Sequence, residues 1–213
     1  MRTLFIDSSR KSLSVALAND DKLIFISNID SHSKHSNYLL SEIKNILTKS
    51  NISINDIDNY VVLIGPGSFT GIRVGVTVAK TLAWTLSKKI YTLNNLEALK
   101  LHANNDIVIS VIPDKKDNSY VGIYSDSIVE DYINITSEKF NISNRSISIV
   151  TMGENEFAKT LYEKLNVNNN IDLKVINDYD YIKLIKYALS KNAVNVHGVK
   201  PIYLKKIDAE KKK

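Results

Sequence analysis

A strand, a glycine-rich loop and a helix follow one another in residues 60–87, which read YVVLIGPGSFTGIRVGVTVAKTLAWTLS. Tyr60–Ile64 is a continuous apolar run, which is typical of a parallel strand covered on both faces. Residues 65–71 form a loop by composition. The helix expected over 71–87 carries apolar residues all round, so we expect one side to face the sheet and another to face a second layer or a partner molecule.

The segments before this stretch complete one α/β unit. Short apolar runs at 3–6, 13–17 and 23–26 are separated by polar turns and predict a three-stranded antiparallel meander. An amphipathic stripe predicts a helix over 34–50. A last strand is expected at 90–93, directly after the apolar helix.

The second half of the chain repeats this order. The expected elements are a helix over 94–102, strands at 107–112, 120–124, 128–133 and 147–150, a helix over 154–165, a strand at 172–175 and a helix over 178–191. Antiparallel strands followed by alternating helices and strands indicate a ribonuclease-H-like α/β layer in each half. We therefore expect two domains, residues 1–95 and 96–213, the second ending in a charged tail.

Composition excludes several classes of function. The chain has 213 residues, a formal net charge of +5 and no cysteine. Disulfide scaffolds, thiol nucleophiles and cysteine-ligated metals are thus ruled out, while the mild positive charge permits contact with RNA or acidic partners. No apolar run approaches the roughly 20 residues that span a bilayer, and residues 1–7 do not begin a secretion signal. We expect a cytoplasmic protein without membrane contact.

The glycine-rich loop has two possible roles. It could bind an anion, because backbone amides at a helix N-terminus attract negative charge; the residues concerned are Gly65, Pro66, Gly67, Ser68, Thr70 and Gly71. However, it lacks the lysine of a P-loop and the glycine spacing of a dinucleotide loop. Alternatively, Gly67, Gly71 and Gly75 recur every four residues, with Ala79 next in the row, which would let another element approach the helix closely.

Candidate catalytic and metal-binding residues are few. Asp7 ends the first strand, where a carboxylate could hold a metal or nucleotide, although a polar turn between two strands is the favoured interpretation. Asp114 ends the corresponding strand of the second half and is expected in a charged hairpin turn. His32 and His35 could share a helix face, yet no acidic residue completes a metal site. Ser68 has no evident base. We therefore predict no catalytic residue and no metal site.

The residues of the glycine loop point to a family. Gly65-Pro66-Gly67-Ser68-Phe69-Thr70-Gly71-Ile72-Arg73-Val74-Gly75 closely resembles the signature of the TsaB (YeaZ) family. Further similar segments are Leu4-Phe5-Ile6-Asp7-Ser8-Ser9, His35-Ser36-Asn37-Tyr38-Leu39-Leu40, Asn95-Leu96-Glu97-Ala98-Leu99 and Pro201-Ile202-Tyr203-Leu204-Lys205. The chain departs from the family pattern at Asn37, at 112–116 and at Lys205.

The resemblance implies an actin-like ATPase superfold and a role in a complex. TsaB-like proteins are non-catalytic subunits that bind the catalytic relative TsaD, which a small ATPase, TsaE, joins; alone they form homodimers. The complex transfers threonylcarbamoyl to N6 of adenosine 37 in tRNAs reading ANN codons, so ATP, ADP and metal would belong to the partners and contact with tRNA would be indirect. By this resemblance the partner interface comprises His35, Leu39, Ile43, Phe69, Ile72, Arg73, Gly75, Val76 and Ala79.

An alternative function stays open at this point. The chain could act alone as an actin-like ATPase or small-molecule kinase, which would need magnesium and Asp7. Kinases of this superfold resemble one another in Asp-x-Gly phosphate turns. Here the turn reads Asp7-Ser8-Ser9 and lacks the glycine, so the resemblance makes Asp7 a vestigial phosphate-site position.

Overall fold

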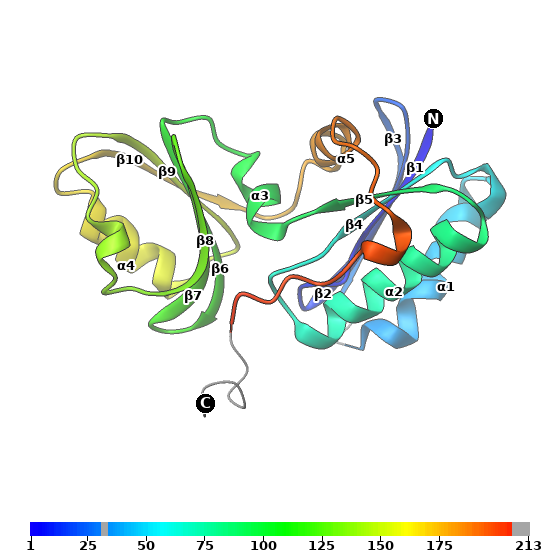
Figure 1. The fold of residues 1–213 in the computed structure, drawn as a ribbon, viewed down its shortest axis with the longest axis horizontal. Coiled ribbons are helices and arrows are strands. Elements are labelled where there is room, and N and C mark those ends of the chain that lie inside the picture. Colours follow the sequence, from blue (N-terminus) through cyan, green and yellow to red (C-terminus); the bar gives the residue numbers. More distant parts are fainter. Residues whose placement is uncertain (31–33, 206–213) are drawn as a thin grey trace. The chain divides into compact units, whose positions relative to one another are not determined.

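A computed structural model describes residues 1–30 and 34–205 as two compact units (Figure 1). The first unit comprises Met1–Asn95 and Asp180–Ile202, and the second comprises Leu96–Tyr179 with the chain from Tyr203 onward. The elements of the first unit are β1 (Arg2–Asp7), β2 (Ser12–Asn19), β3 (Lys22–Asp30), α1 (His35–Lys49), η1 (Ile54–Asp56), β4 (Asn59–Leu63), α2 (Phe69–Thr85), β5 (Lys89–Leu93), α5 (Tyr181–Leu189) and η3 (Val196–Gly198).

The sheet of the first unit has the strand order β3-β2-β1-β4-β5. The first three strands pair antiparallel, whereas β1, β4 and β5 run parallel. Leu4 of the central strand β1 lies opposite both Leu17 and Tyr60. All residues of β4 are buried, so protein covers both faces of this strand. This explains its uninterrupted apolar sequence.

Helices cover both faces of this sheet. Successive side chains of a strand point to opposite faces. Leu4 and Ile6 accordingly join the core beneath α1 and α2, while Phe5 meets the ring of Tyr181 on α5 at 5.4 Å between centroids. Figure 1 shows α1 and α2 side by side on one face of the sheet and α5 on the other.

The second unit repeats the sheet with one covering helix. Its elements are α3 (Asn95–Lys100, beginning at the last residue of the first unit), β6 (Ile107–Lys115), β7 (Asn118–Tyr124), β8 (Ile128–Asn134), η2 (Glu138–Phe140), β9 (Ser146–Met152), α4 (Glu156–Leu165) and β10 (Asn170–Ile176). The strand order is β10-β9-β6-β7-β8. Phe157 and Leu161 of α4 pack on Ile109 and Ile149 of the sheet.

The predicted α/β architecture is confirmed, including the antiparallel meander and the parallel strands that follow it in each half. The domain limits differ from the expected 96–213, because residues 180–202 pack with the first unit. The apolar stripe on α5 identifies a helix with one buried face, but that pattern does not say which of two similar sheets it covers. Among the described helices, none is long and apolar enough to cross a membrane.

Candidate functional site: the glycine loop and the outward side of α1 and α2

The carboxylate of Asp7 is held by its own turn. It is fully buried at the end of β1, where Oδ1 accepts hydrogen bonds from the Ser9 backbone N–H at 2.8 Å and the Ser9 hydroxyl at 2.5 Å. Its Oδ2 accepts from Nε of Arg10 at 2.8 Å, and another nitrogen of that guanidinium donates to Ser14 Oγ. Both carboxylate oxygens are thus engaged within the β1–β2 turn, which leaves Asp7 poorly placed to coordinate a metal.

The glycine loop packs directly on this turn. The Ser68 N–H donates to the Ser9 carbonyl at 2.7 Å, and the Ser8 hydroxyl donates to the Gly71 carbonyl at 2.7 Å. A Cβ at Gly71 would lie 1.9 Å from the Ser8 carbonyl oxygen, and one at Gly75 would lie 2.3 Å from Ser8 Oγ. The small residues of α2 therefore accommodate the chain's own turn, and the packing interpretation of the glycine row is the one that the geometry favours.

Other contacts hold the two ends of the loop. Asn95 Oδ1 accepts from the Gly65 N–H at 2.9 Å, and its Nδ2 donates to Ser9 Oγ. At the other end, Ser68 caps α2: its side chain accepts from the Gly71 N–H at 3.3 Å and its carbonyl accepts from the Ile72 N–H. The amides of Gly65, Gly71 and Ile72 therefore already bond within the chain.

His35 lies under the loop as a core residue. A Cβ at Gly71 would be 2.8 Å from its Cδ2, which shows how closely the start of α1 approaches α2. Burial lowers the pKa of His35, even though a hydrogen bond to the Arg10 backbone and the charge of Asp7 act in the opposite direction, so the imidazole is neutral at pH 7. His32, the other member of the histidine pair considered in the sequence, lies outside the described residues.

No group of three or more histidine, cysteine, aspartate or glutamate side chains comes together in the described part of the chain to hold a metal ion. Asp114 lies within strand β6, before the expected hairpin turn. Its Oδ2 accepts from the Tyr132 hydroxyl at 2.5 Å and from Lys205 Nζ at 2.7 Å. Burial raises the pKa of Asp114, but these two hydrogen bonds and the positive charges of Lys205 and Lys115 together lower the pKa overall.

Seven residues expected at the partner interface are buried in the first unit instead. They are His35, Leu39, Ile43, Ile72, Gly75, Val76 and Ala79, and each belongs to the buried side of α1 or α2. Ala79, for example, has 0% of its surface exposed. In the first unit α1 and α2 thus use their smallest and most apolar sides against their own sheet, and a role of these positions at a partner interface stays a prediction. Phe69 and Arg73 are exposed, so for them the interface stays a prediction.

The outward sides of the two helices form a different surface, which we call the α1–α2 face. Its exposed residues are Asn37, Tyr38, Leu40, Ser41, Lys44, Phe69, Arg73, Thr77, Thr81 and Trp84. Leu40 is 60% exposed and Trp84 is 63% exposed, so both helices present a large apolar side chain on their outward sides. Spacings of three and four residues along α2 link Arg73, Thr77, Thr81 and Trp84 and could have identified this side from the sequence.

The α1–α2 face has local structure of its own. The guanidinium of Arg73 stacks on the Phe69 ring, with its central carbon 3.9 Å from the ring centroid. A shallow groove of about 670 Å³ lies further along, lined by residues that include Leu40, Lys44 and Leu47 of α1 and Leu82 of α2. Apolar side chains beside polar rims are typical of surfaces that bind another protein.

Two ribonuclease-H-like units in one chain constitute the actin-like ATPase superfold. Solved structures share this fold across the whole length. YeaZ from Pseudomonas aeruginosa is 19% identical, with a TM-score of 0.70 over 95% of this chain and 99% of its own. A second Pseudomonas aeruginosa structure, described as similar to peptidase YEAZ, is 18% identical, with a TM-score of 0.72 over 96% of this chain and 99% of its own.

Sequence comparisons find curated relatives that align over nearly the whole chain. The tRNA threonylcarbamoyladenosine biosynthesis protein TsaB of Bacillus subtilis is 28% identical, with 100% of this chain and 97% of the relative aligned. TsaB of Haemophilus influenzae is 24% identical over 95% of this chain and 92% of its own. A model of the TsaD family, tRNA N6-adenosine threonylcarbamoyltransferase, matches residues 27–124. Over nearly its whole length the chain is thus similar in sequence to curated proteins named TsaB and similar in fold to solved structures named YeaZ.

Proposed function

We propose that the chain is a non-catalytic subunit in the biosynthesis of threonylcarbamoyladenosine in tRNA. In this proposal it binds a TsaD-type transferase, which a TsaE-type ATPase joins, and holds the transferase ready to modify N6 of adenosine 37. Similarity to two proteins named TsaB, over nearly the whole of each sequence, supports this role. The match of residues 27–124 to the TsaD family is consistent with common ancestry of subunit and transferase.

The proposal that the chain is non-catalytic rests on the packing at the end of β1. A phosphate turn must present free backbone amides and leave room for the nucleotide. Here the Ser9 N–H is bonded to Asp7, the Ser9 carbonyl to Ser68, and the Ser8 hydroxyl to Gly71. These bonds engage the turn within the chain, which supports the assignment of nucleotide chemistry to the partners.

We place the transferase on the α1–α2 face. Large exposed apolar side chains favour association with another protein surface. Tyr38, Leu40, Phe69 and Trp84 supply such side chains from both helices. Close packing beneath them fixes the backbone of both helices, so the face would meet its partner without rearrangement.

Light scattering on a mixture of this chain with the TsaD-type protein of the same organism tests the proposal. We expect a 1:1 complex, and we expect Leu40→Glu to weaken it at least about tenfold, because a charge would be buried in an apolar contact. Ile128→Glu is the matched control: Ile128 is 70% exposed on β8 of the second unit, and its replacement leaves the complex intact.

Two results would contradict the proposal. If no complex forms with or without nucleotide, the chain is not a subunit of this assembly. If both glutamate variants bind like the unmodified chain while their circular dichroism shows intact folds, the partner binds elsewhere. Tight ATP binding by the isolated chain would instead favour the ATPase or kinase alternative.

A further inference from the structure

The side chain of Asn95 connects two segments of the first unit that lie far apart in the sequence. Its Oδ1 accepts from the Gly65 N–H at 2.9 Å, and its Nδ2 donates to Ser9 Oγ. The backbone N–H of Asn95 also donates to the Gly65 carbonyl at 2.9 Å. Asn95 is 1% exposed and Ser9 is 3% exposed, so bulk water does not compete for these bonds. Asn95 therefore joins the start of the glycine loop to the β1–β2 turn.

The side-chain hydrogen bonds of this chain of groups can run in only one direction. The Gly65 N–H can only donate, so the Asn95 amide must turn its oxygen to Gly65 and its NH2 group to Ser9. The carboxylate of Asp7, which pairs with Arg10, can only accept, so the Ser9 hydroxyl gives it its single proton. Ser9 Oγ is then left as an acceptor, and only a donor at position 95 satisfies it.

Ser9 holds the other end of the loop as well. Its carbonyl accepts from the Ser68 N–H at 2.7 Å, directly before α2 begins at Phe69. The loop is thus attached to Ser9 at both ends, through Asn95 at Gly65 and directly at Ser68. Because Phe69 belongs to the α1–α2 face, the position of the loop sets where this end of the face lies.

We propose that Asn95 is the positioning residue of the glycine loop, and that its amide keeps the start of α2 in the place that the transferase contact requires. The inference rests on the proposed function. The role belongs to the hydrogen-bond donor rather than to the shape of the side chain, because the Ser9 hydroxyl has no second proton to offer. An ionised carboxylate at position 95 has nearly the shape of the amide, but it donates nothing and faces Asp7 across Ser9.

Asn95→Asp tests the donor. The new carboxyl can still donate to Ser9 while it is protonated, but once ionised it cannot, and it then adds a second negative charge near Asp7. Its pKa in the folded chain should therefore lie above the ordinary value of about 3.9. Because the unfolded chain loses this proton first, the urea midpoint of the variant, relative to the unmodified chain, should fall as the pH rises from about 4.5 to about 7.

The other ionisable groups of the turn and of the elements beside it are present in both proteins. They are Asp7 and Arg10 of the turn, His35 at the start of α1, and Glu97 two residues further along the chain in α3. Burial lowers the pKa of His35, against the opposing effect of the charge on Asp7. Because these groups are common to both chains, the difference between the two midpoints reports the group at position 95.

The position of the loop and the binding of the partner are measured directly. At pH 7 we expect the amide protection of residues 65–71 in Asn95→Asp to fall at least about tenfold by hydrogen exchange. The dissociation constant of its complex with the TsaD-type protein, measured by calorimetry, should rise at least about fivefold, because a loosened loop must be ordered on binding. Protection should recover at about pH 4.5. In Asn95→Ala, which removes both side-chain bonds, protection should stay low at both pH values.

Asn155 provides a matched control in the second unit. Its Oδ1 accepts from the Ala158 N–H at 2.7 Å and its Nδ2 donates to Thr151 Oγ1, so the pattern of bonds is the same. Within the described residues the Thr151 hydroxyl donates to no carboxylate, so it can turn toward a new one, which also suits the N-cap of α4. Asn155→Asp should therefore show no fall in relative midpoint between the two pH values and no change in the complex.

The possible failures are distinguishable. If the unmodified chain forms no complex, the proposed function is contradicted, even where the loop responds to pH as expected. If the loop loses protection in both variants of Asn95 while the complex stays as tight as before, the positioning role is overturned and the proposed function stands. The same pH response in Asn95→Asp and Asn155→Asp, or unchanged loop protection in Asn95→Ala, also overturns it. If Asn95→Asp folds only at acidic pH, the predicted loss is complete; if it folds at no pH, Asn95→Ala decides.

Discussion

Gly71 is where α2 approaches the β1–β2 turn most closely. We expect Gly71→Ala to lower the free energy of unfolding by about 3 kcal/mol, because a Cβ would lie 1.9 Å from the Ser8 carbonyl oxygen and 2.8 Å from His35 Cδ2. Urea denaturation measures this difference. Gly198→Ala is the control: a Cβ there meets nothing within 4 Å, so its effect should stay within about 0.5 kcal/mol. Equal stability of the two variants would contradict this packing.

Tyr60 carries a buried hydroxyl whose loss should not harm the protein. Its side chain is fully buried, and the hydroxyl has no hydrogen-bond partner among the described residues. Leaving such a group unsatisfied costs free energy. We therefore expect Tyr60→Phe to leave the stability at pH 7 unchanged or to raise it by up to about 1 kcal/mol. A clear loss in urea denaturation would show that the hydroxyl does have a partner.

The same residue predicts a response to alkaline pH. Burial raises the pKa of Tyr60 from its ordinary 10.0 to about 12. The unfolded chain therefore loses this proton at a lower pH than the folded chain does. As the pH rises from 10 to about 12, deprotonation favours the unfolded state and the free energy of unfolding falls. Above the folded pKa both states have lost the proton, and the effect levels off. Denaturation midpoints measured from pH 9 to 12 should fall less steeply for Tyr60→Phe. If the midpoints of the unmodified chain and of Tyr60→Phe fall equally steeply with pH, the raised pKa of Tyr60 is contradicted.

At the scale of elements, the sequence predicts where helices and strands occur better than what each side of a helix contacts. The periodicity of α1 and the apolar run of β4 identify both elements. The small residues of α2, in contrast, suggest a partner but pack on the chain's own Ser8–Ser9 turn. A stripe of glycine and alanine permits any close neighbour, so only the structure distinguishes the chain's own turn from a second protein.

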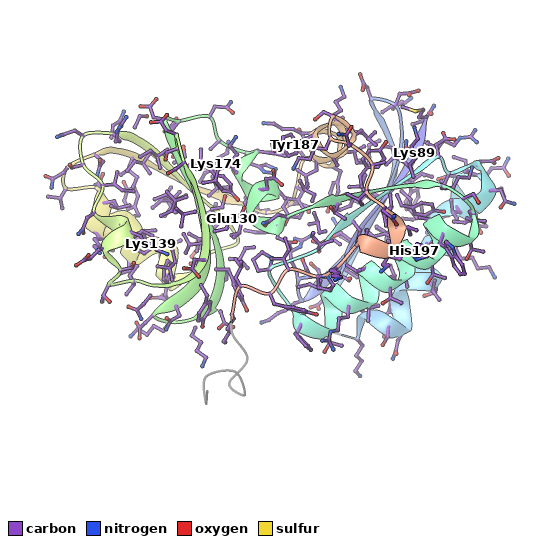
Figure 2. The ribbon with its side chains drawn as sticks, viewed as in Figure 1. Lys89, Glu130, Lys139, Lys174, Tyr187 and His197 are labelled. Carbon is purple, nitrogen blue, oxygen red and sulfur yellow. The ribbon has the colours of Figure 1, made fainter. Side chains whose placement is uncertain are left out.

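The side chain of Lys80 helps to attach the segment after α5 to α2. Lys80 Nζ donates to two carbonyls near η3, and the Trp84 ring lies 6.2 Å from that of His197, which Figure 2 labels beside α2. We expect Lys80→Met to lower stability by about 1–2 kcal/mol and to speed amide hydrogen exchange in residues 194–202. Lys89→Met, on the neighbouring β5, should leave exchange there unchanged. Equal exchange in the two variants would contradict this role.

At the scale of the whole molecule, the two-layer repeat could be predicted and the path of the chain between units could not. Residues 180–202 return to the first unit, where the Val194 N–H donates to Ile90 and the Ile202 N–H to Ile64. These are backbone hydrogen bonds, which any residue but proline can donate. The side-chain sequence therefore holds little information about them, whereas the apolar pattern of each strand does indicate its burial.

The central claim is that this chain enables a transferase without being one. Its most direct test is the formation of threonylcarbamoyladenosine in tRNA by reconstituted TsaD- and TsaE-type proteins, with and without this chain. We expect product only when the chain is present, with Leu40→Glu inactive and Ile128→Glu active, since one replaces a residue of the α1–α2 face and the other an equally apolar residue elsewhere. Equal product without the chain, or product from the chain alone, would contradict the account.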